Sequence, residues 1–121
     1  MKNRLKVLVC GEASFLDSGF STYQYQLLNR LRNNPNIHVA ELACYAGVND
    51  PRDYKCNWRF YPNSVSSQDS RAKLFNSNGQ NSFGKWRFDY CLLDFKPDVV
   101  IDIRDYWMNG FQEVSPLRDY Y

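Results

Sequence analysis

The chain has 121 residues, of which 44% are hydrophobic and 17% aromatic, and its formal net charge at pH 7 is +2. This length fits one domain with a single core and is short for a two-domain enzyme. The 15 basic and 13 acidic residues are mixed along the chain, which argues against a nucleic-acid-binding protein, and no apolar run reaches the roughly 20 residues of a membrane span.

The first predicted elements are a buried strand, a loop with two glycines and a helix. Residues 5–10 form a short apolar run, as in a strand buried on both faces. We expect Gly11 to let the backbone turn sharply and Gly19 to permit the close approach of a ligand, although glycines here also serve as plain turn residues. Three hydroxyl residues are candidate N-caps of the helix: Ser18, Ser21 and Thr22. The free amides of such a helix end attract anions, but the dinucleotide and P-loop fingerprints are both missing.

The first helix is predicted to end before Pro35. Its expected apolar face consists of Tyr23, Leu27, Leu28 and Leu31, and its expected polar face of Gln24, Gln26, Asn29, Arg30 and Arg32. Residues 37–45 alternate in polarity and begin with β-branched side chains, which predicts a second strand. His38, the one histidine, would lie at the amino end of that strand and therefore at the surface, away from the ligand edge.

The middle of the chain is predicted to hold more loop than core. Residues 46–55 are rich in Gly, Asn, Asp and Pro and predict a loop, and residues 58–61 predict a short third strand. Residues 64–82 are too polar to build core, so we expect a mobile excursion there, interrupted by a short helix at 71–75.

A second amphipathic helix is predicted to end at Lys96-Pro97. Its expected apolar residues are Phe83, Trp86, Tyr90 and Leu93, with Cys91, Leu92 and Phe95 on the adjacent stripe. Residues 98–103 then form the next buried strand, and a polar and aromatic loop follows at 104–110. Cys10, Cys44 and Cys91 lie in apolar runs and are expected to be small core residues.

Alternating strands and helices predict an α/β fold with a parallel sheet and helices on both faces. In such a sheet, ligands bind outside the carboxyl ends of the strands, where the loops at 11–21, 46–55 and 104–110 would converge. Arg104 could bind a phosphate or carboxylate there, and Asp105 could orient a hydroxyl or act as a base. A local ion pair between the two is an equally simple interpretation.

With these residues in view, the chain resembles the amino-terminal Rossmann-like domain of GT-B glycosyltransferases, particularly the retaining, nucleotide-sugar-dependent group. The resemblance rests on residues 7–23 and on the Lys-Pro-Asp-Val-Val-Ile-Asp-Ile-Arg-Asp-Tyr-Trp stretch at 96–107. It implies a single domain over 1–121, the incomplete N-terminal half of the fold, with the C-terminal donor-binding domain absent. Asp102 and Arg104 stand where the family often has histidines.

The same resemblance implies site residues and a reaction. Gly19, Phe20 and Ser21 would border the donor phosphates, with Gly11 and Ser18 shaping the loop. Catalytic roles would fall to Arg104 and Asp105, and the acceptor side or cleft wall would include Glu12 and Trp107. A sugar would pass from a nucleotide-sugar, a co-substrate rather than a bound cofactor, to an unknown acceptor, and the chain alone would be inactive.

Two other classes remain open. A small non-enzymatic α/β module that binds a nucleotide, a phosphate or a partner protein would explain the size, as would a half-domain that pairs with a separately encoded partner. The four cysteines form no C-x-x-C pair and have no histidine at metal spacing, so we expect no metal. With no signal peptide before Leu5, the expected location is the cytoplasm.

Overall fold

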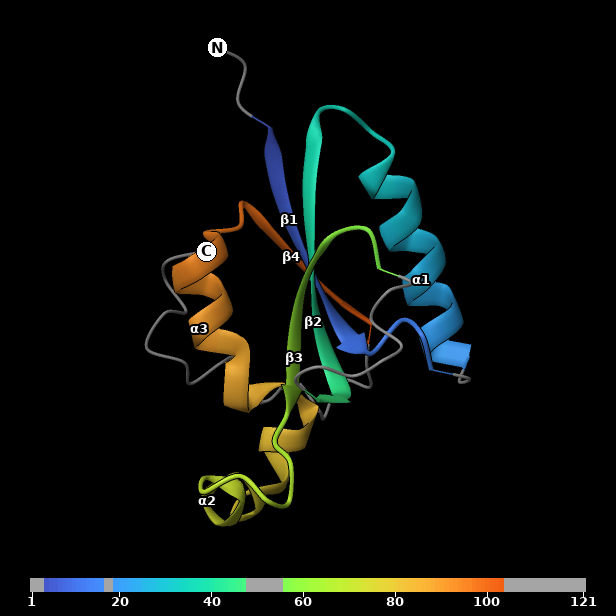
Figure 1. Ribbon diagram of the computed structural model, residues 1–121. Helices are drawn as coiled ribbons and strands as arrows, with labels where there is room; N and C mark the ends of the chain where they lie inside the picture. The colour runs from blue at the N-terminus through green and yellow to red at the C-terminus, as the bar shows by residue number, and fades with distance from the viewer. Residues whose placement is uncertain (1–3, 17–18, 48–55, 104–121) are drawn as a thin grey trace.

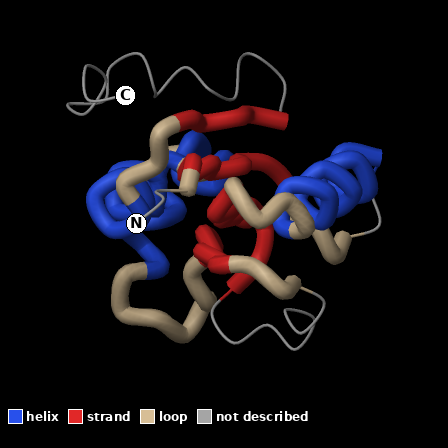
Figure 2. The backbone as a smooth tube through the Cα atoms, turned by 90° about the horizontal axis from the view of Figure 1, so that it is seen from above, coloured by secondary structure: helices blue, strands red, loops and turns tan. Residues whose placement is uncertain are grey.

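A computed structural model describes residues 4–16, 19–47 and 56–103 of the chain. The elements are β1 (Leu5–Glu12), α1 (Gly19–Arg32), β2 (Ile37–Gly47), β3 (Arg59–Ser64), α2 (Ala72–Asn76), the 3₁₀ helix η2 (Gly79–Phe83), α3 (Lys85–Phe95) and β4 (Val99–Ile103). The four strands form one sheet in the order β3-β2-β1-β4, and every neighbouring pair is parallel. Helix α1 lies on one side of the sheet and α3 on the other (Figure 1, Figure 2). The predicted Rossmann-like α/β fold is confirmed.

Each face of the sheet has its own hydrophobic layer, because successive side chains of a strand point to opposite faces. The layer under α1 is built from Val7, Val9, Leu28 and Val39. The layer under α3 is built from Leu8, Cys10, Ala40, Leu42, Tyr61, Phe88, Cys91, Leu92 and Phe95. The core positions predicted for Cys10, Cys44 and Cys91 are confirmed, since all three are buried.

The predicted apolar faces of both helices are partly wrong. In α1, Tyr23 is 64% exposed while Gln24 is fully buried, because the Gln24 amide has a buried carboxylate to bind. In α3, Tyr90 and Leu93 are exposed and Phe88 is buried instead. The spacing of the aromatic residues at 83, 86 and 90 predicts an apolar helix face along them, but the face that packs against the sheet is centred on Phe88 and Leu92.

The polar stretch at 64–82 is not the coreless excursion that its composition predicts. It contains α2, which confirms the short helix, and η2, and it buries Phe75 and Asn81. The Asn63 side-chain amide donates to the Asn81 backbone carbonyl at 2.7 Å, and the Asn81 side-chain amide donates to the Phe75 backbone carbonyl at 2.9 Å. Buried amides therefore hold this segment together where apolar residues are scarce.

Strand β4 is less buried than its apolar sequence predicts. Val99 is 40% exposed and the other four residues are half-buried. Within the described chain β4 pairs with β1 on one side only, so its outer edge and flank have no covering element there.

Candidate functional site

The carboxyl edge of the sheet brings the start of α1 next to the end of β4. Gly19, Phe20 and Tyr23 of α1 line an open, largely apolar hollow of about 550 Å³ together with Ile103, the last residue of β4. Phe20 is 48% exposed and Tyr23 is 64% exposed, so both rings present surface there. Segments about 80 residues apart in sequence thus meet at the edge where parallel sheets bind ligands.

Gly11 does not make the sharp turn predicted for it. Gly11 lies inside β1, not at a turn, and a Cβ added to it would sit 2.0 Å from the Gln24 side-chain oxygen and 2.8 Å from the Ile103 carbonyl oxygen. Gly19 begins α1, and a Cβ there would meet nothing within 4 Å. Gly11 is therefore the position of close approach, between α1 and the end of β4.

Behind this edge, a buried carboxylate joins three segments of the chain. Glu41 of β2 is fully buried on the α1 face. It accepts hydrogen bonds from the Ser14 amide at 2.8 Å, the Ser14 hydroxyl at 2.9 Å, Gln24 Nε2 at 2.7 Å and Trp58 Nε1 at 3.0 Å. The carboxylate thereby ties the segment after β1 to α1 and to the approach of β3.

Burial is the largest influence on this group. It raises the pKa of Glu41, while the donors of Trp58, Ser14 and Gln24 act in the opposite direction. Gln24 has its second polar atom, Oε1, buried beside Gly11 with no hydrogen-bond partner in the described structure. A protonated Glu41 could satisfy that oxygen if the Gln24 amide turned over, so the two side chains form a proton-sensitive pair.

Sequence reasoning missed this network. Its signal was a single acid in the apolar run Val39-Ala40-Glu41-Leu42-Ala43-Cys44, since a lone buried carboxylate must find donors. Gln24 was assigned to the polar face because a helical pattern does not show which amides have a buried partner. Nothing in the local sequence links Trp58 to Glu41.

The predicted site residues fall into two groups. Gly11, Glu12, Gly19, Phe20 and Ser21 lie at or near the carboxyl edge, with Ser21 buried in α1 and Glu12 half-buried at the end of β1. The others, Ser18, Arg104, Asp105 and Trp107, lie outside the described residues. Asp102 is in β4 and half-buried, and His38 lies at the exposed amino end of β2 as predicted.

Within residues 4–16, 19–47 and 56–103, no three His, Cys, Asp or Glu side chains are placed to hold a metal ion together. The helices of those same ranges include none long and apolar enough to cross a membrane. Comparison with known proteins gives no match to any family model, curated protein or solved structure.

Proposed function

We propose that this chain is the amino-terminal Rossmann-like half of a glycosyltransferase that uses a nucleotide-sugar donor. The observation that carries the proposal is the hollow shared by Gly19, Phe20, Tyr23 and Ile103. It lies at the carboxyl edge of a parallel sheet, and the chain continues from Ile103 directly into Arg104 and Asp105. A second, donor-binding domain belongs to this proposal and would lie outside these 121 residues.

The exposed aromatic rings suit this role. Sugar rings have apolar C–H faces that pack on aromatic side chains, and Phe20 and Tyr23 offer two such rings at the hollow. The backbone amides of the first turn of α1 carry partial positive charge and favour a diphosphate nearby. An aromatic wall beside an anion-attracting helix end matches the two halves of a nucleotide-sugar at its sugar–phosphate junction.

The chemical step suggests roles for four of the predicted residues. The bond between the anomeric carbon and the diphosphate oxygen breaks, and its electron pair leaves with the nucleoside diphosphate. Arg104 and the α1 amides would stabilise that developing charge. The acceptor hydroxyl forms the new bond and gives its proton to a base, for which Asp105 is the candidate. Glu12 and Trp107 would bind acceptor hydroxyls and the sugar face.

Titration calorimetry with UDP-, GDP- and ADP-sugars tests the proposal on the 121-residue chain. One donor class should bind weakly, because most of the donor contacts would belong to the second domain. Phe20→Ala should weaken that binding about tenfold because a stacking ring is lost. Tyr90→Ala is the matched control, since Tyr90 is 52% exposed on α3 and does not line the hollow. It should leave the affinity unchanged.

Two results would count against this function. Turnover by the 121-residue chain alone would contradict the need for a second domain. Equal binding of the free nucleotide and its sugar conjugate, with no effect of Phe20→Ala, would favour the non-enzymatic nucleotide-binding module instead.

A further inference from the structure

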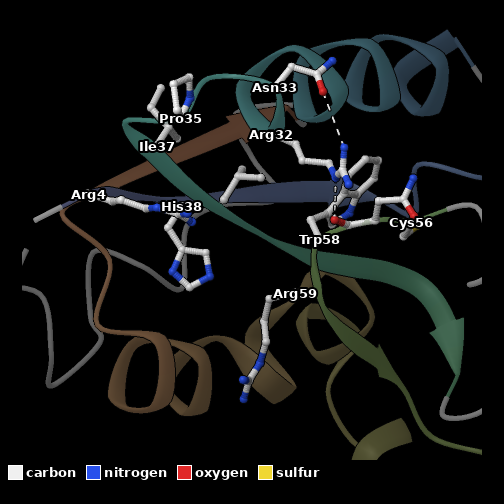
Figure 3. Close-up of a pocket in the computed structure, with 11 residues that line it drawn as sticks. Arg4, Arg32, Asn33, Pro35, Ile37, His38, Cys56, Trp58 and Arg59 are labelled. Atoms are coloured by element: carbon white, nitrogen blue, oxygen red, sulfur yellow. Dashed lines mark hydrogen bonds between the residues drawn. The ribbon is translucent and has the colours of Figure 1, made fainter.

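A second hollow lies at the opposite, amino edge of the sheet, beside the start of β2 (Figure 3). Its volume is about 730 Å³. Its lining residues are Arg4, Arg32, Asn33, Pro35, Ile37, His38, Val39, Cys56, Asn57, Trp58 and Arg59. Among the described residues, three arginines and a histidine line this hollow and no acidic residue does, so this lining is basic.

The hollow exists because β3 joins β2 late. The pairing of β2 with β3 begins at Ala40 opposite Arg59, whereas β2 itself begins at Ile37. Continued backward, this register would place Asn57 opposite His38. Arg32 prevents that pairing, because its Nε donates to the Asn57 carbonyl at 2.8 Å and holds the chain toward α1.

Within the described residues, the edge of β2 at Ile37–Val39 that faces away from β1 has no pairing strand. The Leu5 backbone amide donates to the Asn36 carbonyl at 2.9 Å. Along a strand, the backbone groups of successive residues point to opposite neighbours, so those of Asn36 and His38 face β1. Those of Ile37 and Val39 face away from β1. The Ile37 amide is used in a turn, where it donates to the Asn34 carbonyl at 3.1 Å. Since no described strand pairs with this side of β2 before Ala40, the Ile37 carbonyl and the Val39 amide face the hollow. They are the two groups that one residue of an added parallel strand would bind.

Cations flank this open edge on both faces of the sheet. Arg32 lies on the α1 side, whereas His38 and Arg59 lie on the α3 side, and Arg4 extends toward His38 (Figure 3). Successive side chains of an extended strand also point to opposite faces. A strand laid along Ile37–Val39 would therefore direct neighbouring side chains to cations on each side.

We propose that this hollow is a docking groove for an extended acidic segment of a partner protein, which adds to the sheet beside Ile37–Val39 and places carboxylates against Arg4 and Arg32. Strand addition supplies affinity through backbone hydrogen bonds, and the charges supply selectivity. A second copy of this chain fits poorly, because pairing equal edges would bring the arginines together.

The walls of the groove are already fixed. The Trp58 indole is held by its hydrogen bond to Glu41 and packs on Tyr25 with ring centroids 5.7 Å apart. Arg32 is bound to Asn57, and its Nη1 lies 3.5 Å from the Asn33 side-chain oxygen. A ligand would therefore meet a preorganised surface, with little ordering required on binding.

The pKa of His38 responds to the positive charges around the groove. Partial burial, followed by the charges of Arg4, Lys6 and Arg59, lowers the pKa of His38. On the α3 side the His38 ring forms a T-shaped pair with Phe95, with ring centroids 5.0 Å apart. The nearby acids are engaged: Asp94 pairs with Arg59 at 2.6 Å, and Asp98 accepts from the Lys6 backbone amide at 2.9 Å. An acidic ligand would offset the cations and raise the pKa of His38.

Capped hexaglutamate is the probe, titrated into the full chain by calorimetry and followed through the ring signals of the one histidine. We expect binding, together with an upward shift of the His38 pKa. Arg4→Gln and Arg32→Gln should each weaken binding about tenfold. Arg30→Gln is the matched control, since Arg30 is two residues from Arg32 on α1 and does not line the groove; it should leave the affinity within about twofold.

Two further ligands separate strand addition from simple anion binding. Hexaglutamate N-methylated at its central residues keeps its charge but loses the backbone donors, so it should bind about tenfold more weakly. Tripolyphosphate offers charge without a backbone. Equal affinity for N-methylated and unmodified peptide, tighter binding of tripolyphosphate, or an unshifted His38 pKa in wild type would each overturn the proposal. Thermal unfolding of each variant checks that it is folded, and none of these outcomes depends on nucleotide-sugar binding.

Discussion

Replacing Glu41 with glutamine separates two effects that compete at this buried group. Burial favours the protonated acid, whereas the donors of Ser14, Gln24 and Trp58 favour the carboxylate, and burial is the larger effect. Glutamine has nearly the same shape and is neutral at every pH. Its amide can donate to the partnerless Gln24 oxygen once the Gln24 amide turns over. The E41Q protein therefore carries no charge at this site, as in the protonated wild type, but at every pH.

The sign of the pH effect follows from the raised pKa. A glutamate that holds its proton more tightly when folded contributes its full stability below the unfolded pKa, near 4.5, and loses it as pH rises through the folded pKa. The loss for one group is at most about 1.4 kcal/mol per pH unit. The E41Q protein lacks this loss, so the stability difference between wild type and E41Q should shrink as pH rises from 4.5.

The stability difference between wild type and E41Q also has a part that does not depend on pH. Glu41 Oε2 accepts from both the Ser14 amide and Gln24 Nε2, and an amide nitrogen in its place can accept from neither. Gln24 can turn over, but the Ser14 backbone amide cannot, so one buried donor stays unpaired. That donor costs about 1–3 kcal/mol. Wild type should thus be more stable than E41Q by about this amount at the acid end.

Urea unfolding of both proteins between about pH 4.5 and 8 measures the difference, provided that each transition is two-state. Glu12→Gln removes one acid from the half-buried end of β1 and serves as the baseline for losing a carboxylate. A wild-type advantage that grows with rising pH would refute the reasoning. It would show that four donors outweigh burial at Glu41.

Five further substitutions, arranged as two pairs and one single change, test the packing by urea unfolding. Gly11→Ala places a methyl 2.0 Å from the Gln24 oxygen and should destabilise by about 1–3 kcal/mol or more, whereas Gly19→Ala enters open space and should change stability by less than about 1 kcal/mol. Phe88→Ala empties a buried site and should cost about 3–5 kcal/mol, against less than about 1 kcal/mol for the exposed Leu93→Ala. Tyr61→Phe removes the 2.6 Å hydrogen bond from its hydroxyl to Asp94 and should cost about 1 kcal/mol. Equal effects within either pair, or a neutral Tyr61→Phe, would contradict the contacts described.

The element order could be predicted because it depends on local patterns. Apolar runs at 5–10 and 98–103, the break at Pro35 and the end at Lys96-Pro97 each depend on a few adjacent residues. Parallel pairing then follows from the alternation of strands and helices. These features explain why the α/β fold with helices on both faces was predictable.

Contacts between distant residues could not be predicted in the same way. Gly11 is required because α1 and β4 approach it, and that approach involves Gln24 and Ile103, far from it in sequence. The groove at the amino edge depends on where β3 begins to pair with β2, and Arg32 binds the Asn57 carbonyl just before that point. Neither is visible in a periodic pattern, since each depends on how finished elements meet.

Glu41 also connects the two edges of the sheet. Its Oε1 accepts from the Ser14 hydroxyl, on the path from β1 to α1, and from the Trp58 indole, in the wall of the amino-edge groove. A bound strand that displaced the Trp58 indole would change the hydrogen bonding of Glu41 Oε1, the oxygen that also accepts from the Ser14 hydroxyl. Linkage requires that any effect of such a strand on Glu41 protonation be matched by an equal effect of protonation on its binding. Because His38 titrates in the same groove, comparing wild type with the E41Q protein would separate the two contributions to a pH-dependent affinity.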